Sequence, residues 1–294
     1  MRCGYNSILM KIERNCLICG DKGTPLGKSY ESAFLGKCQK CSMVFSTLIP
    51  DATELKIHYS NYDRNAEVSN LTYHVYDSWF AKWRESGFGS LLDFGCGLGA
   101  LVDYANLNGF SSVGTEIDSD VVEKLSQKGV KVRELEQIMS GPEKYNVISV
   151  IEVLEHVADP KMVLNQLRKK LSEPGVLFIT TPNFNALNRR ILKGNWRALS
   201  YPDHINIFST QSIKTLLEEC GYKIVSMETS GHILLDRISG TESPNKVSKI
   251  LSIENQRNFF SKNSFTSKIK VFLNYLLNRM NLGDTLTVNA IICK

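Results

Sequence analysis

The sequence lacks any long uninterrupted hydrophobic segment. Its apolar runs end well short of the roughly 20 residues that a membrane-spanning helix needs. The N-terminus, MRCGYNSILMKIERN, holds only a short apolar stretch, too short for the hydrophobic region of a secretory signal peptide. These two absences predict a cytoplasmic protein without a membrane span.

A strong excess of either charge is also missing. The chain contains 35 Lys and Arg residues and 30 Asp and Glu residues, a formal net charge of +5 over 294 residues. This excess is too small and too dispersed to indicate a nucleic-acid-binding surface. With 43% hydrophobic residues and no internal repeat, the composition is that of a globular protein. The length fits one large domain, or one medium domain with a small appendage.

Cysteine is plentiful, and its spacing is informative. Of the eight cysteines, four form two C-x-x-C pairs, Cys16 with Cys19 and Cys38 with Cys41. In a chain without an export signal, cysteines are more often free thiols or metal ligands than partners in disulfides. Two thiolate pairs supply the four soft ligands that a structural zinc ion prefers, at a spacing typical of a zinc ribbon. We therefore predict a zinc-ribbon module over residues 1–50.

The zinc in such a module is expected to be structural, because a closed four-thiolate site leaves no open coordination position. Gly20 and Ser42 follow the second cysteine of each pair, where a compact residue lets backbone N–H groups turn back toward sulfur. Two coincidental pairs of free or redox-active thiols are the alternative. His58 supplies a further nitrogen nearby, and we expect it on the surface of the linker that follows.

Aromatic residues gather between residues 51 and 89, which we expect to form a helical linker or lid. Tyr76, Phe80 and Trp83 recur at helical spacing, which indicates a helix that packs one aromatic face against the core. An aromatic lid over a bound ligand is the alternative.

From residue 90 to 294, short apolar runs alternate with amphipathic helices. This pattern is typical of an α/β fold with a parallel sheet covered on both faces. Helices are predicted after Pro160, with Asp159 as the N-cap, around Ile213, and over residues 269–280. Residues 238–264 fit the alternation poorly and indicate an insertion or flap. The predicted strands are 91–94, 112–117, 130–134, 146–151, 176–180, 223–227 and 285–293.

A glycine-rich turn follows the first of these strands directly. Residues 91–99 read LLDFGCGLG, a G-x-G-x-G spacing that differs from the G-x-G-x-x-G of dinucleotide-binding turns. Open α/β sheets bind their ligands at this position. Glu116 ends the second strand, where a carboxylate can accept hydrogen bonds from ribose hydroxyls. The pattern predicts a nucleoside-containing cofactor.

Three separated motifs carry a family resemblance. The segment DFGCGLG, Glu116 and the later IEVLEHVADP resemble class I S-adenosylmethionine-dependent methyltransferases, in the branch that includes the ubiquinone-biosynthesis O-methyltransferases. The resemblance covers roughly residues 75–294. It implies a Rossmann-like sheet of seven strands in the order 3-2-1-4-5-7-6, with the seventh antiparallel. More loosely, a cysteine-paired module ahead of this domain is similar to bacterial methyltransferases of sugar and surface-polysaccharide biosynthesis.

The resemblance implies S-adenosylmethionine as the cofactor and assigns its contacts. The glycines would lie beside its methionine and ribose parts, and a carboxylate after the fourth strand would face its sulfonium. Whether Glu155 and His156 serve catalysis or a structural hydrogen bond is open. The implied cofactor residues are Asp93, which orients the turn, Gly95, Gly97, Gly99, Glu116 for the ribose, Ile117 for the adenine and Glu152 for the sulfonium.

A basic segment after the fifth strand is the candidate acceptor site. Arginines can fork onto phosphate, and a tryptophan can stack on a sugar face, so the segment predicts an anionic acceptor such as a nucleotide sugar. A solvated basic helix with a core tryptophan is the equal alternative. The candidate acceptor residues are Asn183, Arg189, Arg190, Trp196 and Arg197.

His204 is the candidate general base, because imidazole accepts a proton near neutral pH and the segment PDHINIFS resembles a family motif near the acceptor site. Asp203 would orient it, and a packing histidine is the alternative. No constellation of catalytic metal ligands is visible in the sequence.

Together these features predict an S-adenosylmethionine-dependent O-methyltransferase that acts on a small-molecule or saccharide acceptor. An RNA base methyltransferase is the second hypothesis, although the module is not strongly basic and no Asn-Pro-Pro-aromatic signature occurs. A third is a non-catalytic protein that uses its zinc ribbon to dock a partner.

Overall fold

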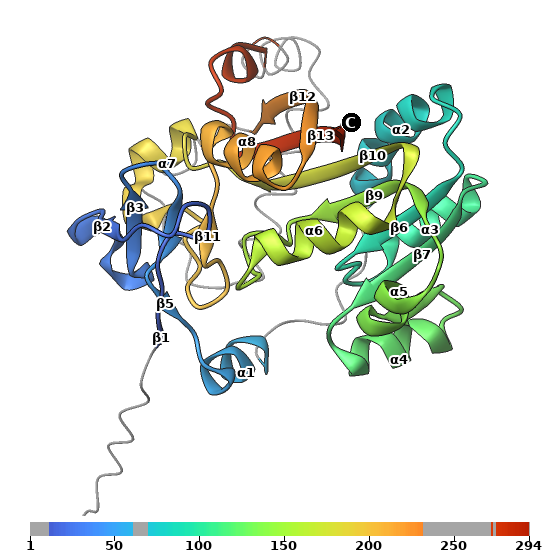
Figure 1. Ribbon diagram of the computed structural model, residues 1–294, viewed down its shortest axis with the longest axis horizontal. Coiled ribbons are helices and arrows are strands. Elements are labelled where there is room, and N and C mark those ends of the chain that lie inside the picture. The colour runs from blue at the N-terminus through green and yellow to red at the C-terminus, as the bar shows by residue number, and fades with distance from the viewer. Residues whose placement is uncertain (1–11, 61–69, 232–271, 273–274, 294) are drawn as a thin grey trace, which may run out of the picture.

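The computed structural model describes residues 12–60, 70–231, 272 and 275–293 (Figure 1). The predicted insertion at 238–264 and Cys3 lie outside these residues, as do five positions of the predicted helix at 269–280. Residues 275–279 of that helix are helical, as predicted. Within the described part of the chain, no helix combines the length and the apolarity that a membrane crossing requires.

A seven-stranded sheet forms the centre of the molecule. Its strand order is β12-β13-β10-β9-β6-β7-β8, and all neighbours are parallel except those of β13, which is antiparallel to both β10 and β12. This arrangement confirms the expected order 3-2-1-4-5-7-6. The strands are β6 (Ser90–Phe94), β7 (Ser111–Glu116), β8 (Val132–Glu134), β9 (Tyr145–Ile151), β10 (Leu171–Pro182), β12 (Tyr222–Ser230) and β13 (Thr285–Ile292).

Helices cover this sheet where the periodicity predicts them. In α6, the N-cap Asp159 accepts a hydrogen bond from the Met162 amide at 2.9 Å. The predicted apolar face of this helix is buried, although the chain enters β10 already at Leu171, earlier than expected. The helices are α3 (Ala100–Leu107), α4 (Ser119–Gln127), α5 (Leu135–Ser140), α6 (Pro160–Lys170), α7 (Leu187–Leu192) and α8 (Thr210–Glu219).

The aromatic segment forms α2 (Asn70–Glu85), which follows α1 (Ala52–Ser60). Tyr76, Phe80 and Trp83 are all buried. The Phe80 ring lies 4.9 Å from that of Tyr104 in α3, and the Trp83 ring lies 5.5 Å from that of Phe178 in β10. The helix therefore packs against the core, as the favoured interpretation predicts.

The first 50 residues contain β1 (Ile12–Glu13), β2 (Gly23–Pro25), β3 (Leu35–Cys38), β4 (Val44–Ser46) and β5 (Leu48–Ile49). We call residues 12–49 the cysteine module. Strand β11 (Asn206–Ile207) pairs with β4, so the module's four-stranded sheet, β11-β4-β3-β2, includes a strand that follows β10 by more than twenty residues (Figure 1). Phe45 of the module also shares a buried cluster with Phe208 and Ile213. A common sheet and a common core thus join the module to the later part of the chain.

Candidate functional site

The glycine turn lies between β6 and α3, at the carboxyl end of the sheet. Gly95, Gly97 and Gly99 have φ values of 76°, 52° and 76°, a region that glycine adopts without steric cost. A Cβ on Gly95 would lie 2.6 Å from Val153, whereas a Cβ on Gly97 would meet no heavy atom within 4 Å. The turn is therefore closed on the side of Val153 and open at Gly97, where a ligand can approach the backbone.

Glu116, at the end of β7, is held beside this turn by two backbone amides. Its Oε2 accepts a hydrogen bond from the Gly97 amide at 3.0 Å, and its Oε1 accepts one from the Ile117 amide at 2.8 Å. The Ile117 side chain is 90% exposed. A fixed carboxylate next to an uncovered apolar side chain matches the expected contacts to ribose and adenine.

Two more acidic groups flank the turn. Asp93 is buried in β6 and accepts a hydrogen bond from Ser149 Oγ at 2.8 Å. Its burial, together with the charge of Glu116, raises the pKa of Asp93 to about 7. Glu152, just after β9, accepts a hydrogen bond from Thr180 Oγ1 at 3.0 Å. Both acidic groups therefore lie toward the carboxyl ends of their strands, at the edge of the sheet that holds the glycine turn.

These residues fit S-adenosylmethionine. The open backbone at Gly97 gives room for the ligand, Glu116 offers acceptors to ribose hydroxyls, and the acidic groups complement a sulfonium. The expected cofactor residues thus gather at one edge of the sheet, with Asp93 bonded to β9 beneath the turn.

A second polar group lies on the same loop, three residues beyond Glu152. We call Glu155, His156, Asp203 and His204 the His156 cluster. Glu155 is fully buried; its Oε2 accepts a hydrogen bond from Thr181 Oγ1 at 2.9 Å, and its Oε1 has no hydrogen-bond partner among the described residues. Burial, and then the charge of Glu152, raise the pKa of Glu155 to about 8. This carboxyl therefore holds a proton near neutral pH.

Asp203 does not pair with His204, which was its expected partner. Asp203 Oδ1 lies 2.8 Å from His156 Nδ1, whereas its Oδ2 lies 3.9 Å from His204 Nε2, which is too long for a hydrogen bond. His204 Nδ1 instead lies 2.9 Å from the carbonyl oxygen of Ala198. Asp203 therefore orients His156 and not its sequence neighbour.

The two imidazoles have different electrostatic surroundings. Burial lowers the pKa of His156, but the hydrogen bond to the Asp203 carboxylate and the charge of that carboxylate oppose it, and the pKa is raised overall. Burial and the charge of His156 lower the pKa of His204. The rings meet edge to face at 4.6 Å. His58, expected on the surface, is partly buried and lies 3.7 Å from Asp203 Oδ2.

The members of this cluster come from two segments that are distant in the chain, so the sequence alone does not predict that they meet. Glu155, His156 and His204 each offer one potential metal-ligand atom, and these atoms lie within 4.8 Å of one another. This grouping is not visible in the sequence, because the fold alone brings the three side chains together. The motif EHV follows β9 closely, whereas PDH comes some twenty residues after β10, so no local signal indicated that the two meet.

The candidate acceptor residues do not gather around one opening. Asn183 is fully buried and donates hydrogen bonds to the carbonyl oxygens of Asn281 and Gly283. Trp196 is 4% exposed, and its Nε1 donates to Asp284 at 3.2 Å. These contacts tie β10 to the segment before β13, and they leave the indole no open face for a sugar.

The arginines of this segment differ from one another. Arg189 is half-buried; it donates from Nε to the carbonyl oxygen of Phe184 and stacks 4.2 Å above that ring. Arg190 and Arg197 are exposed. Only these two present guanidinium groups that an anionic acceptor can reach without breaking an internal contact.

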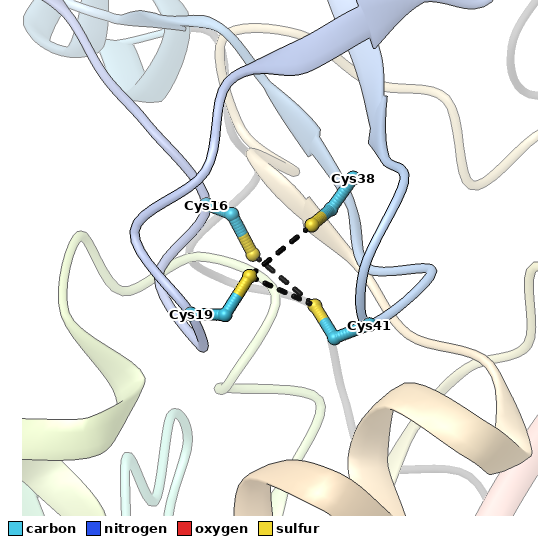
Figure 2. Close-up of side chains that lie close together, drawn as sticks. All are labelled: Cys16, Cys19, Cys38 and Cys41. Atoms are coloured by element: carbon cyan, nitrogen blue, oxygen red, sulfur yellow. Dashed lines mark hydrogen bonds between the residues drawn. The ribbon is translucent and has the colours of Figure 1, made fainter.

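The four module cysteines converge as their spacing predicts. Figure 2 shows their sulfur atoms pointing toward one another from two loops, and all four lie within 4.8 Å of one another. The Sγ distances are 3.3 Å for Cys16–Cys41, 3.3 Å for Cys19–Cys38 and 3.8 Å for Cys19–Cys41. A disulfide needs about 2.05 Å. Sulfurs tetrahedrally bound at about 2.3 Å from zinc lie roughly 3.8 Å apart, so the arrangement fits that ion.

Known proteins resemble this chain in sequence. The family model for a methyltransferase domain matches residues 60–227, more than half of the chain. The ubiquinone biosynthesis O-methyltransferase of Pseudomonas savastanoi pv. phaseolicola is 31% identical over 138 residues, 42% of this chain and 58% of that protein. Its counterpart in Bartonella tribocorum is 26% identical over 212 residues, 69% of this chain and 71% of that protein. The chain thus spans a little over half the length of the first of these relatives.

Solved structures share the fold at low sequence identity. A SAM-dependent methyltransferase from Archaeoglobus fulgidus has a TM-score of 0.51 and 18% identity, and the match covers 82% of this chain and all of that one. The plantazolicin methyltransferase BamL, solved with S-adenosylhomocysteine, has a TM-score of 0.50 and 17% identity, covering 83% and 92%. The family model, the sheet order and the glycine turn agree, and the chain therefore belongs to the methyltransferase-domain family.

Proposed function

We propose that this methyltransferase transfers its methyl group to a hydroxyl oxygen of a small-molecule or saccharide acceptor. The observation that carries the proposal is the His156–Asp203 pair, with 2.8 Å between Nδ1 and Oδ1, at the edge of the sheet that holds the glycine turn. A hydroxyl must lose a proton when it is methylated, so its site needs a proton acceptor nearby. A nitrogen with a free lone pair can attack without one.

The loop over residues 152–156 connects the glycine turn, where the cofactor would bind, to the His156 cluster. Val153 packs against the glycine turn, and His156, three residues later, is part of the cluster. When bound, S-adenosylmethionine supplies an electrophilic methyl group on a sulfonium and leaves as a neutral thioether. The acceptor oxygen forms the new C–O bond as the C–S bond breaks, and its proton passes to His156 Nε2. Asp203, bonded to Nδ1, stabilises the imidazolium that results.

The solvent reaches this base only in part. The His156 side chain is 27% exposed and that of Asp203 is 11% exposed. Partial exposure lets the proton leave to solvent after transfer, while the low local polarity strengthens the attraction between imidazolium and carboxylate. The acceptor hydroxyl is therefore activated in a site that excludes most, but not all, water.

For the acceptor we favour an anionic saccharide, such as a nucleotide sugar or a surface-glycan precursor, as in polysaccharide biosynthesis. Support comes from the exposed Arg190 and Arg197, whose guanidinium groups can bind phosphate in a bidentate manner. The names of the relatives, ubiquinone biosynthesis O-methyltransferases, support oxygen as the methylated atom. Methylation of an RNA base is the second candidate, because the same arginines suit a phosphate backbone.

For the module we infer one structural zinc ion per chain, held by Cys16, Cys19, Cys38 and Cys41. Gly20 and Ser42, with φ values of 78° and 61°, turn the backbone after each pair as their sequence position predicts. Four thiolates close the coordination shell, so the ion serves the fold and takes no part in methyl transfer.

The proposal is tested with the full-length, zinc-loaded chain, labelled S-adenosylmethionine and three acceptor pools: nucleotide sugars, polyhydroxylated aromatics and RNA. We expect saturable methylation of a hydroxyl in one of the first two pools, with a salt dependence weaker than that of RNA binding. Methylation confined to RNA bases, or to nitrogen or carbon in any pool, would contradict it.

A further inference from the structure

The segment that carries Asp203 and His204 is held in place by the cysteine module. Strand β11 begins two residues after His204 and pairs with β4, with Asn206 opposite Phe45 and Ile207 opposite Val44. The Ser46 amide also donates to the carbonyl oxygen of Ile205 at 2.8 Å. The backbone next to Asp203 therefore has its position set by a strand of the module.

Arg14, two residues before the first module cysteine, reinforces this connection. Its Nε donates to the carbonyl oxygen of Ser46 at 2.6 Å, and one terminal nitrogen donates to Asn206 Oδ1 at 3.0 Å and also to the Ile205 carbonyl oxygen. Its guanidinium also lies over the ring of Phe45, 5.5 Å from the centroid. A guanidinium presents several donors in one plane, which suits it to hold the backbone at Ser46, the backbone at Ile205 and the Asn206 side chain at once.

The same residues extend to the loop of His156. The amides of Ile205 and Asn206 both donate to the Glu155 carbonyl oxygen, at 2.9 and 3.0 Å. Asn206 Nδ2 donates to the carbonyl oxygens of Leu154 and Val157, at 3.0 and 2.7 Å. One polar network thus runs from Arg14 through residues 205–206 to the backbone on both sides of His156, and it sets the distance between His156 and Asp203.

The cysteine loops anchor the other end of this network. Lys161 Nζ of α6 donates to the carbonyl oxygen of Ile18, inside the first C-x-x-C loop, at 2.7 Å. Cys16 and Cys38 are buried within the same apolar cluster as Phe208, which follows β11. The Glu116 carboxylate is held differently, because it accepts its hydrogen bonds from the amides of Gly97 and Ile117, outside this network.

We propose that the cysteine module is a positioning element of the catalytic site, in which Arg14 and the metal-held loops set the His156–Asp203 geometry. Arg14 is the positioning residue, acting through Ile205 and Asn206. The inference rests on the proposed role of His156. It predicts that damage to the module slows methyl transfer and changes its pH dependence while the affinity for S-adenosylmethionine stays the same.

The test compares Arg14→Gln with Arg14→Lys and with Lys28→Gln, a matched control at an exposed side chain of the same module that lies outside both cysteine loops. For Arg14→Gln we expect one zinc per chain, unchanged calorimetric affinity for S-adenosylmethionine and a loss of at least about tenfold in kcat. The acidic limb of the kcat profile should move to lower pH, because a longer distance to Asp203 lowers the pKa of His156. Arg14→Lys should recover part of the loss, and Lys28→Gln should match the wild type.

A second readout separates this inference from the proposed function. NMR titration of the His156 ring measures its pKa and tautomer without any acceptor, so it works even if oxygen methylation fails. A downward shift of that pKa in Arg14→Gln, or in wild-type protein stripped of zinc by a chelator, supports the positioning role. An unchanged His156 pKa and an unchanged kcat in Arg14→Gln would overturn it. If Arg14→Gln does not fold, the chelated wild type decides: retained turnover and an unshifted His156 pKa would overturn the inference equally.

Discussion

Asp203 Oδ1 lies 2.8 Å from His156 Nδ1, although 47 residues separate the two in the chain. The carboxylate fixes which imidazole nitrogen carries the proton and leaves Nε2 as the free acceptor. This one contact moves the proposed base from His204, which the sequence favours, to His156. It also brings a segment that is distant in the chain from the glycine turn into the proposed catalytic site.

The first prediction concerns the base. His156→Gln should lower kcat about 100-fold or more, because general bases contribute about 10²–10⁴-fold, while the dissociation constant for S-adenosylmethionine stays within about twofold. His204→Gln should cost less than tenfold, since its Nδ1 is tied to the Ala198 carbonyl oxygen. Steady-state kinetics and calorimetry measure both. A larger loss for His204→Gln would restore the original assignment.

The second prediction concerns Glu116. Glu116→Ala should weaken binding of S-adenosylmethionine at least tenfold, because it removes both carboxylate oxygens next to Gly97 and Ile117. The far-UV circular dichroism spectrum should not change. Glu123→Ala, at an exposed side chain of α4, is the matched control and should bind like the wild type. Equal affinity in the two variants would remove Glu116 from the ribose contacts.

The third prediction concerns pH and stability. The pKa of Glu155 is raised from 4.5 to about 8, so the folded state holds a proton that the unfolded chain releases. Stability from this group is therefore present below about pH 4.5 and is lost as pH rises toward 8, by up to about 1.4 kcal/mol per pH unit. Glu155→Gln cannot ionise and should lose less stability over this window.

Urea denaturation of the wild type, Glu155→Gln and the exposed-site control Glu136→Gln, at several pH values from 5 to about 8.5, measures this effect. The difference between wild type and Glu155→Gln should shift in favour of the variant as pH rises. Parallel curves for all three proteins would show that Glu155 ionises normally in the folded state.

The fourth prediction concerns Trp196. Because its indole is buried and bonded to Asp284, Trp196→Phe should destabilise the fold by about 1–2 kcal/mol. The KM for the acceptor should stay within about twofold of the wild type. Arg197→Gln, at an exposed position, should instead raise the KM of an anionic acceptor and leave stability unchanged. A raised KM in Trp196→Phe at wild-type stability would support a sugar-stacking role.

The fifth prediction concerns the cysteines. Cys38→Ser should reduce bound zinc well below one per chain and lower the melting temperature by at least about 5 °C, since Cys38 is buried in the core. Cys293→Ser, at an exposed cysteine, is the control. Elemental analysis and thermal denaturation measure both. Full zinc occupancy in Cys38→Ser would rule out the four-thiolate site.

Local sequence signals predict the position of the glycine turn and its neighbours well. The glycine turn, Glu116 and Asp159 each act within a few residues of their strand or helix, so spacing alone places them. The sheet order came from the family resemblance. Spacing alone also places the two C-x-x-C pairs, because each turn is built within five residues.

The contacts around His156 are harder to predict from the sequence, because they join segments that are distant in the chain. The Asp203–His156 pair, the β4–β11 pairing and the buried Glu155 depend on how separate chain segments come together at one sheet edge, which no local pattern encodes. Trp196 shows the limit in another way. A tryptophan among arginines suits both a sugar platform and a core, and only the partner Asp284, 88 residues away, distinguishes them.

The most direct test of the central claim is the product of turnover with ¹³C-methyl-labelled S-adenosylmethionine and the pooled acceptors, read by carbon NMR. We expect the wild type to form a product whose labelled methyl carbon has the chemical shift of an O-methyl group, and His156→Gln to form little of it. A methyl carbon on nitrogen or carbon, or an O-methyl product formed equally well by His156→Gln, would contradict it.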